Sequence, residues 1–426
     1  MNFEIPIVAD QNTFPQVPPS TKLAILLPSA RWSPMVRSII GSLVGVASEE
    51  VAILIADNSE SSQKRQFIEA MRGINPNIIA IAHKKNIGAF ENFLYLFDWS
   101  KDVPFIAIMA DDDWASPDYH VDAYRALVEI PNASQVEAGT ALVDFGDGKL
   151  IYASQNSMIG NAAIDRMTQW SGIVARITMY NVSRRAACEA AIQYIRATPL
   201  HGTTLMENLW ELNKLALGDF IHTTGHGCYV HYPAMCSHHG NTSQRIYEGW
   251  YKEAGLEYPF VWFGDLSTAI QCATFLMGKF SPISDPVQRL ACGQHVFRHI
   301  FRDCFFPRFS GGECQAALPM LLALHTAAMD GVKRYCTLSF SQNAVISRDL
   351  IDWFIEVIRV FESRSQTTLP LLSERFRIFI DSMSCDFAQC GDELSYGSEH
   401  GRSDLSAPQQ NQEKMGLGWL LKRLMS

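Results

Sequence analysis

The chain has 426 residues, of which 47% are hydrophobic and 19% are charged, and its formal net charge is −9. This length exceeds the size at which one hydrophobic core usually stops growing, so we expect at least two domains. No apolar run reaches the roughly 20 residues that a membrane-spanning helix needs, and no basic block offsets the negative charge. These features exclude an integral membrane protein and a nucleic-acid-binding protein as the expected classes.

The amino-terminal end carries no export signal that we recognise. Residues 1–20 include early acidic residues, lack a basic segment and contain no uninterrupted apolar core, so we expect a cytoplasmic protein. The same residues are rich in proline and polar side chains, which predicts an extended arm rather than a packed element. The 10 cysteines are scattered without a CxxC pair, which predicts free, mostly buried thiols.

Apolar runs and helical segments alternate from residue 21 to residue 110. The expected strands are 23–27, 51–56, 78–82 and 105–110, and the expected helices are 35–46, 63–72 and 88–99. Strands separated by helices pair in parallel, and right-handed crossovers place all their carboxyl ends at one edge of the sheet. The pattern therefore predicts an α/β fold with a mostly parallel central sheet flanked by helices, and a ligand crevice at that edge.

The alternation is weaker after a helix expected past residue 119, which indicates that the sheet becomes mixed. We expect a helix to residue 129, a hairpin of 141–145 and 149–153 around a Gly-Asp-Gly turn, helices at 184–196 and 204–217, and a strand at 228–231. We expect the first domain to span residues 21–245.

Helical periodicity dominates the rest of the chain. We expect an α-helical domain at 246–390, a flexible linker at 391–412 that is polar and rich in Gly and Ser, and an amphipathic helix at 413–426. This last helix has two interpretations: it packs on its own domain, or it makes a peripheral contact with the inner face of a membrane or with a partner.

Three consecutive aspartates follow the fourth apolar run, in the segment PFIAIMADDDWASP of Pro104 to Pro117. Two like charges about 4 Å apart repel by roughly 1 kcal/mol even in water, so such a cluster favours a bound cation. Mn²⁺ and Mg²⁺ prefer carboxylate oxygens and often take one or two of them together with substrate phosphates. We expect Asp111 and Asp113 to share the crevice and Asp112 to point elsewhere. The alternative is a loop that only caps the following helix.

Two other strand ends carry polar residues. The first run ends in Pro28-Ser29-Ala30-Arg31, and the second ends in Asp57-Asn58-Ser59. An Asp at such an edge can accept hydrogen bonds from a base or a ribose. The same residues are also typical of turns and helix caps, and that alternative stays open.

A polar turn, His83 to Gly88, joins the third strand to the next helix. Asn86 and Gly88 permit unusual backbone angles, and the amino end of a helix favours anions. The turn is therefore a candidate neighbour of a diphosphate. In the alternative, Lys84 and Lys85 simply face water.

The order of four segments, KLAILLPS, VAILIADNSES, KKNIGAFENF and FIAIMADDDWASP, resembles the family 2 glycosyltransferases, which have the nucleotide-diphospho-sugar transferase (GT-A) fold. The resemblance covers about residues 21 to 240. It implies a hexosyltransferase-like enzyme that moves a sugar from a nucleoside diphosphate sugar to an acceptor hydroxyl, with inversion, using Mn²⁺ or Mg²⁺. The acceptor, whether a glycan, a lipid-linked molecule or a protein, is not specified by the sequence.

The resemblance also assigns residues by position. Asp57 matches the aspartate that contacts the base, Asp111 the acid near ribose and metal, and Asp113 the metal ligand that bridges the diphosphate. The full nucleotide-sugar set implied in this way is Pro28, Ser29, Asp57, Asn58, Lys85, Asn86, Gly88, Asp111 and Asp112.

The family places an acidic general base at the start of a helix near the acceptor. Glu207, in the segment MENLW, occupies this position where the family usually has Asp. A Glu can take the acceptor proton, although its extra methylene shifts the reach by roughly 1.5 Å. A solvent-facing helical Glu is the alternative. Among the later histidines we favour His238, with His239, as a third metal or phosphate contact, the alternative being loop histidines without a ligand.

Two other functions remain open from the sequence. A phosphohydrolase of the haloacid dehalogenase type also has a D-x-D after a buried strand, but on its first strand rather than its fourth, with the first Asp as nucleophile. The second alternative is a catalytically inactive protein that binds sugar nucleotides or partners. It stays open because the usual Asp is absent at position 207.

Overall fold

A computed structural model describes residues 5–8, 14–143, 150–153, 156–171, 179–197, 206–223, 229–231, 268, 272–273 and 275–300. Contacts divide the chain into two compact units, and the described residues up to 231 together with 280–292 belong to the first. The expected domain boundary near 245, the linker at 391–412 and the helix at 413–426 lie outside the described residues. So do His238 and His239.

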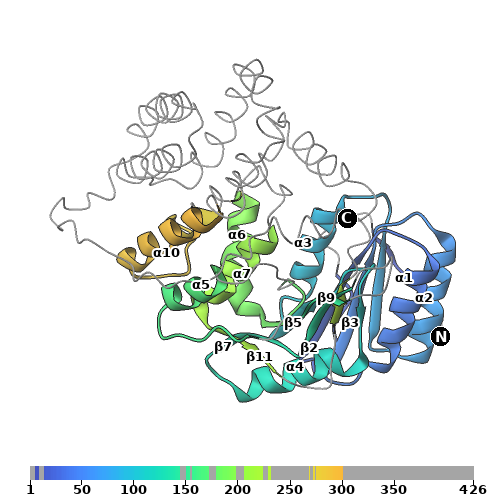
Figure 1. Ribbon diagram of the computed structural model, residues 1–426. Coiled ribbons are helices and arrows are strands. Elements are labelled where there is room, and N and C mark those ends of the chain that lie inside the picture. Colours follow the sequence, from blue (N-terminus) through green and yellow to red (C-terminus); the bar gives the residue numbers. More distant parts are fainter. Residues whose placement is uncertain are drawn as a thin grey trace, which may run out of the picture. The chain divides into compact units, whose positions relative to one another are not determined.

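The expected alternation of strands and helices is present at the amino-terminal end of the first unit (Figure 1). In chain order the elements are β2 (Leu23–Ser29), α1 (Pro34–Ser42), the 3-10 turn η1 (Leu43–Gly45), β3 (Val51–Asp57), α2 (Ser62–Ile74), β4 (Ile78–His83), α3 (Ala89–Trp99) and β5 (Phe105–Ile108). β2 pairs in parallel with both β3 and β5, and β3 pairs in parallel with β4. The predicted parallel core is therefore confirmed.

The central sheet has eight strands in the order β1-β4-β3-β2-β5-β10-β7-β11. Its later members are β7 (Ala133–Glu137), β10 (Val182–Arg184) and β11 (Asp219–His222). β10 pairs antiparallel with β5 and β7, whereas β7 and β11 pair in parallel. We did not expect these three strands, because each is short and lacks a clear apolar alternation.

Helices cover both faces of this sheet, which explains why β3 and β4 are buried along their whole length. One face packs against α1, α2 and α4 (Pro117–Glu129) in a single hydrophobic cluster. On the other face, Phe93 and Phe97 of α3 make edge contacts with Trp210 of α7 (Met206–Leu217). The helices α5 (Ala163–Ser171) and α6 (Glu189–Ala197) complete this part, and α6 follows a 3-10 turn, η2 (Arg185–Cys188).

A second, four-stranded sheet has the order β6-β12-β8-β9. Its strands are β6 (Trp114–Ala115), β8 (Thr140–Val143), β9 (Leu150–Ala153) and β12 (Tyr229–His231). β8 and β9 pair antiparallel, as the expected hairpin requires. Because β6 follows the three aspartates directly, its pairing with β12 brings Tyr229 next to them.

The prediction that the amino-terminal arm does not pack is wrong for β1 (Ile7–Val8), which pairs in parallel with β4. The Trp99 indole also donates to the Pro15 carbonyl at 2.7 Å. The reason is that the outer edge of β4 exposes unpaired backbone groups, and even a two-residue strand satisfies some of them.

Little of the expected helical half is described. Its longest described helix is α10 (Pro286–His299). Three described cysteines, Cys188, Cys272 and Cys292, are free and buried, as predicted. Among the described residues, no helix has the length and apolar character that crossing a membrane requires.

Candidate functional site

The strand order changes direction at β2, which makes the carboxyl end of β2 a candidate ligand-binding position. The chain proceeds from β2 outward through β3 to β4, and then returns to add β5 on the other side of β2. In open parallel sheets, ligands bind outside the carboxyl ends of the strands at such a switch point. Ser29 is the last residue of β2, Ala30 and Arg31 follow it, and the aspartates follow β5, so both segments lie at this edge of the sheet.

Asp111 is enclosed by the loop that follows β2. Its Oδ2 atom accepts hydrogen bonds from the Ser29 hydroxyl at 2.8 Å and from the Ala30 and Arg31 backbone N–H groups, each at 3.1 Å. The residue is 6% exposed. Three donors on one carboxylate oxygen fix the orientation of the Asp111 side chain against this loop.

Arg31 also contacts the aspartates through its side chain. One guanidinium nitrogen, Nη1, pairs with Asp112 and lies 3.9 Å from Oδ1 of Asp111. We expected Asp112 to point away from Asp111, and this prediction is wrong, because both carboxylates meet the same guanidinium. The physical reason is that β5 ends at Ile108, so residues 111–113 form a turn in which the side chains do not alternate as on a strand.

Asp113 makes a different contact. Its Oδ2 atom accepts a hydrogen bond from the Tyr229 hydroxyl at 2.8 Å, and both side chains are 0% exposed. Desolvation and the neighbouring Asp113 charge raise the pKa of Tyr229 well above its ordinary value, so this phenol stays a donor. The Tyr180 ring stacks on Tyr229, with ring centroids 5.0 Å apart and planes at 9°.

Asp57, at the end of β3, belongs to a buried ion pair. Its Oδ1 atom lies 2.9 Å from the Lys64 ammonium and accepts the Ser59 backbone N–H at 3.0 Å, and the Asp57 and Lys64 side chains are both 0% exposed. The turn-forming alternative for Asp57 is thus observed. Its Oδ2 atom is buried without a hydrogen-bond partner among the described residues and faces Nε of Arg65 at 3.6 Å.

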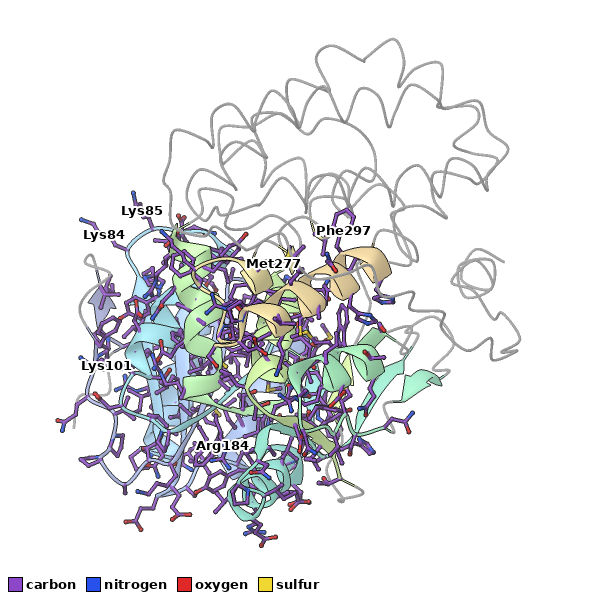
Figure 2. The ribbon with its side chains drawn as sticks, turned by 90° about the vertical axis from the view of Figure 1, so that its left-hand side faces the viewer. Lys84, Lys85, Lys101, Arg184, Met277 and Phe297 are labelled. Carbon is purple, nitrogen blue, oxygen red and sulfur yellow. The ribbon has the colours of Figure 1, made fainter. Side chains whose placement is uncertain are left out.

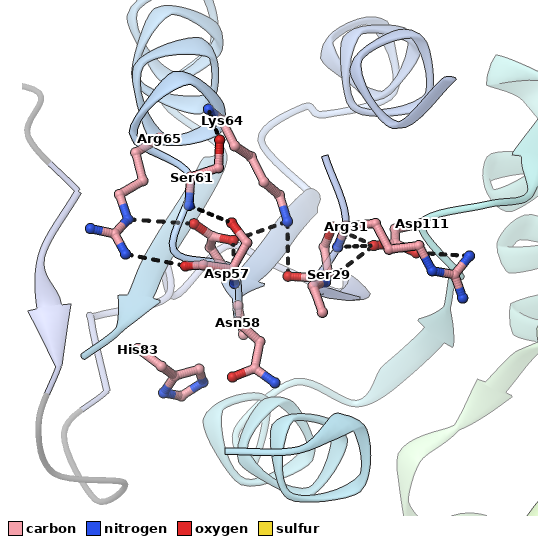
Figure 3. A network of polar contacts seen from close by, with 12 residues as sticks. Ser29, Arg31, Asp57, Asn58, Ser61, Lys64, Arg65, His83 and Asp111 are labelled. Atoms are coloured by element: carbon pink, nitrogen blue, oxygen red, sulfur yellow. Dashed lines mark hydrogen bonds and ion pairs between the residues drawn. The ribbon is translucent and has the colours of Figure 1, made fainter. Parts of the chain in front are cut away.

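Lys64 links the two acidic positions (Figure 3). Its ammonium donates to the Ser29 carbonyl at 2.9 Å, and the Ser29 hydroxyl donates to Asp111. Burial lowers the pKa of Lys64, and the adjacent Asp57 charge opposes this shift. The expectation that Asp57 and Asp111 lie at one edge of the sheet is therefore confirmed, with Lys64 and Ser29 between them.

The turn between β4 and α3 is held by amide side chains. Asn58 donates to Oδ1 of Asn86 at 2.9 Å and to the Gly88 carbonyl at 3.0 Å, while its own Oδ1 accepts the Ile87 N–H at 2.8 Å. Gly88 has φ of 89°, a value that L side chains rarely adopt, and it caps α3. Lys84 and Lys85 are exposed and project from the surface (Figure 2).

Two more predicted residues are described. Pro28 lies within β2, opposite Ala56 of β3, so it belongs to the sheet. Glu207 is exposed in the first turn of α7. Burial raises the pKa of Tyr180 well above its ordinary value, and Glu207 is the nearby charge with the largest further effect, followed by Asp113 and Asp112. The structure thus places Glu207 and the aspartates around the same phenol.

The donor chemistry at this edge suits a hard divalent cation. Asp111 and Asp113 offer carboxylate oxygens, the ligands that Mg²⁺ and Mn²⁺ prefer. Among the described residues, no group of three His, Cys, Asp or Glu side chains forms a complete metal site. The two carboxylates fit a site in which the substrate supplies further ligands.

Sequence reasoning missed four residues of this site: Arg31, Lys64, Tyr180 and Tyr229. Arg31 had a usable signal, because it is the first cation after β2 and the strand order brings it to the aspartates. Lys64, Tyr180 and Tyr229 had none, since nothing in the residues around them indicates a site.

Sequence comparisons give no match for this chain. No family model matches it, and no curated protein is significantly similar to it.

Solved structures do resemble this chain. A crystal structure of S. aureus TarS has a TM-score of 0.50 at 10% identity over 85% of this chain and 55% of that chain. Residues 1–349 of TarS in complex with UDP-GlcNAc give a TM-score of 0.49 at 11% identity over 86% of this chain and 92% of that chain. The same TarS fragment alone gives 0.46 at 11% identity, with the same shares covered. This chain and S. aureus TarS have a similar fold. The chain spans about half the length of TarS in the longer crystal structure.

Proposed function

We propose that this protein is a metal-dependent glycosyltransferase that moves a sugar from a nucleoside diphosphate sugar to an acceptor hydroxyl. The observation that carries the proposal is the set of carboxylates Asp111 to Asp113 at the switch point of a parallel sheet, with the β2 loop wrapped around the first of them. An anionic, metal-bound group is the ligand that such an edge suits. The fold shared with TarS is consistent with this role.

The nucleotide would lie along the ends of β2, β3 and β4. Asn58, Asn86 and Gly88 form the rigid turn at one side, and Lys85 provides an exposed positive charge for the phosphates. A base N–H would reach Oδ2 of Asp57 only after Arg65 moves aside, because that atom is buried and faces Nε of Arg65. We therefore assign Asp57 to the base end of the site, with Arg65 as the residue that covers it.

The metal, Mn²⁺ or Mg²⁺, would be held by Asp113 and Asp111, with His238 as a candidate further ligand. When bound, such an ion stabilises the negative charge of the leaving diphosphate. The protein's own contribution is to hold both carboxylates in place. Ser29 and two backbone N–H groups do this for Asp111, and Tyr229 does it for Asp113.

Glu207 would act as general base. The acceptor hydroxyl gives its proton to a Glu207 carboxylate oxygen as its own oxygen bonds to the anomeric carbon and the bond to the diphosphate breaks. A single displacement of this kind inverts the anomeric centre. The exposed position of Glu207 beside Tyr180 supports this role, because the base must meet an incoming acceptor.

The test combines binding with turnover. UDP-GlcNAc and UDP are the first ligands to try, because TarS has been crystallised with both. Thermal shift with Mn²⁺ and a panel of nucleoside diphosphate sugars identifies the donor, and hydrolysis or transfer of its sugar is then measured. We expect Asp113→Asn to lower turnover by at least roughly a hundredfold. Asp118→Asn, at an exposed site in the first turn of α4, is the matched control and should retain turnover.

Other outcomes would favour other functions. Near-normal turnover by Asp113→Asn contradicts the proposal. Release of phosphate from simple phosphate esters, without a nucleotide sugar, would support a phosphohydrolase instead. Donor binding without transfer or hydrolysis under all tested metals and acceptors would support a sugar-nucleotide-binding protein without activity.

A further inference from the structure

We infer that Arg31 is the built-in counter-cation of the aspartate cluster and that it competes with the divalent metal for these carboxylates. The inference rests on the proposed function in one respect only, namely that Asp111 to Asp113 are where a divalent cation binds. It adds a residue that neither the sequence nor the fold comparison assigns, and it predicts how the site behaves before a nucleotide arrives.

The contacts of Arg31 support this role. Three adjacent carboxylates need a positive charge nearby, and among the described residues Arg31 forms the ion pairs with Asp111 and Asp112. The side chain approaches both acids through the same nitrogen atom. The Arg31 side chain is 48% exposed, whereas the side chains of Asp111 and Asp112 are 8% and 16% exposed, so Arg31 lies on the solvent side of the cluster. A cation entering from solvent therefore meets Arg31 first.

The backbone of Arg31 is fixed independently of its side chain. Its N–H donates to Oδ2 of Asp111, whereas the guanidinium lies toward Oδ1 of the same carboxylate. The long, half-exposed side chain can thus leave the aspartates while the loop that holds Asp111 stays in place. This separation is what an exchangeable counter-ion requires, because the carboxylate geometry survives the exchange.

The two cations are alternatives because both would lie near Oδ1 of Asp111. Oδ1 of Asp111 is the oxygen left over by the three donors on Oδ2, and Nη1 of Arg31 lies 3.9 Å from it. A divalent cation at that oxygen would be repelled by the guanidinium. Once displaced, a guanidinium can bind phosphate oxygens through two parallel hydrogen bonds. Arg31 would then weaken binding of the metal alone and strengthen binding of a metal-bound diphosphate.

The experiment measures Mn²⁺ binding to the full chain by isothermal titration, without nucleotide, and then measures UDP binding in saturating Mn²⁺. We expect Arg31→Gln to bind Mn²⁺ alone about fivefold to tenfold more tightly than the unmodified chain, because one repelling charge about 4 Å away is removed. We expect the same variant to bind UDP more weakly. Arg31→Lys keeps the charge and should stay close to the unmodified chain in Mn²⁺ affinity.

The matched control is Arg37→Gln. Arg37 is an exposed arginine on α1 that lies over the Phe67 ring, away from the aspartates, so its replacement should change neither affinity. If Arg31→Gln binds Mn²⁺ with unchanged or lower affinity, or if neither this variant nor the unmodified chain binds Mn²⁺, the inference is wrong. Because this measurement uses no sugar donor, a failure of sugar transfer with the Mn²⁺ effect intact would overturn the proposed function and leave the inference standing.

Discussion

Replacing Lys64 with methionine tests whether the buried ion pair holds the edge of the sheet together. Lys64 is 0% exposed, its ammonium lies 2.9 Å from Asp57, and it donates to the Ser29 carbonyl. Methionine fills a similar volume but removes the charge and the donor. Asp57 would then remain as a buried carboxylate without its main partner.

The size of the effect follows from this burial. Removing one partner of a buried ion pair typically costs about 3–5 kcal/mol, most of it the penalty of the charge left behind. Removing both charges, as in Lys64→Met with Asp57→Asn, costs far less, because Asn still accepts the Ser59 N–H and no lone charge stays buried. The two substitutions should therefore be strongly non-additive.

Native-state hydrogen exchange measures this effect where it acts. The Asn58 N–H, which donates to the Ser29 carbonyl at 2.8 Å, and the amides of β2 and β3 should exchange roughly a hundredfold to a few thousandfold faster in Lys64→Met. Lys84→Met, at an exposed lysine, is the control and should stay within about 0.5 kcal/mol of the unmodified chain. A loss below about 1 kcal/mol in Lys64→Met, or simple additivity in the double variant, would refute the reasoning.

Two further predictions concern stability. Burial lowers the pKa of His120 to about 3, so this imidazole is neutral when folded, whereas the unfolded chain binds a proton below pH 6.5. Its contribution to stability is thus complete above pH 6.5 and is lost as the pH falls toward 3, by about 2 kcal/mol at pH 5. Urea unfolding at pH 7 and pH 5 should show this loss of unfolding free energy in the unmodified chain and a smaller loss in His120→Leu. Equal losses in the two proteins would contradict the role of His120. Gly88→Ala should cost about 1–2 kcal/mol, because φ is 89° and an added Cβ meets no atom within 4 Å. Gly45→Ala, which also meets no atom and has no such φ, should be neutral or slightly stabilising, and equal unfolding midpoints for the two variants would exclude backbone strain at Gly88.

The parallel core was predictable because its strands are buried on both faces and so appear as continuous apolar runs. β2, β3 and β4 all lie within two residues of the expected bounds. Short strands such as β10 and β11 were not predictable, since three or four residues carry too little periodicity. Their partners in the sheet, and not their own residues, make them strands.

The candidate site shows the same division. The sequence alone determined that polar residues follow the apolar runs at positions 29, 57 and 111, because strand ends must return to solvent, and parallel pairing then brings them to one edge. Only the tertiary structure decided which side chains pair with these acids. Arg31 lies 81 residues from Asp112, and Tyr229 lies 116 residues from Asp113. Lys64 donates to the carbonyl of Ser29, which is 35 residues away.

 Contacts of this kind, between residues that are distant in the chain, depend on how the strands and helices pack, and no local pattern of residues encodes them.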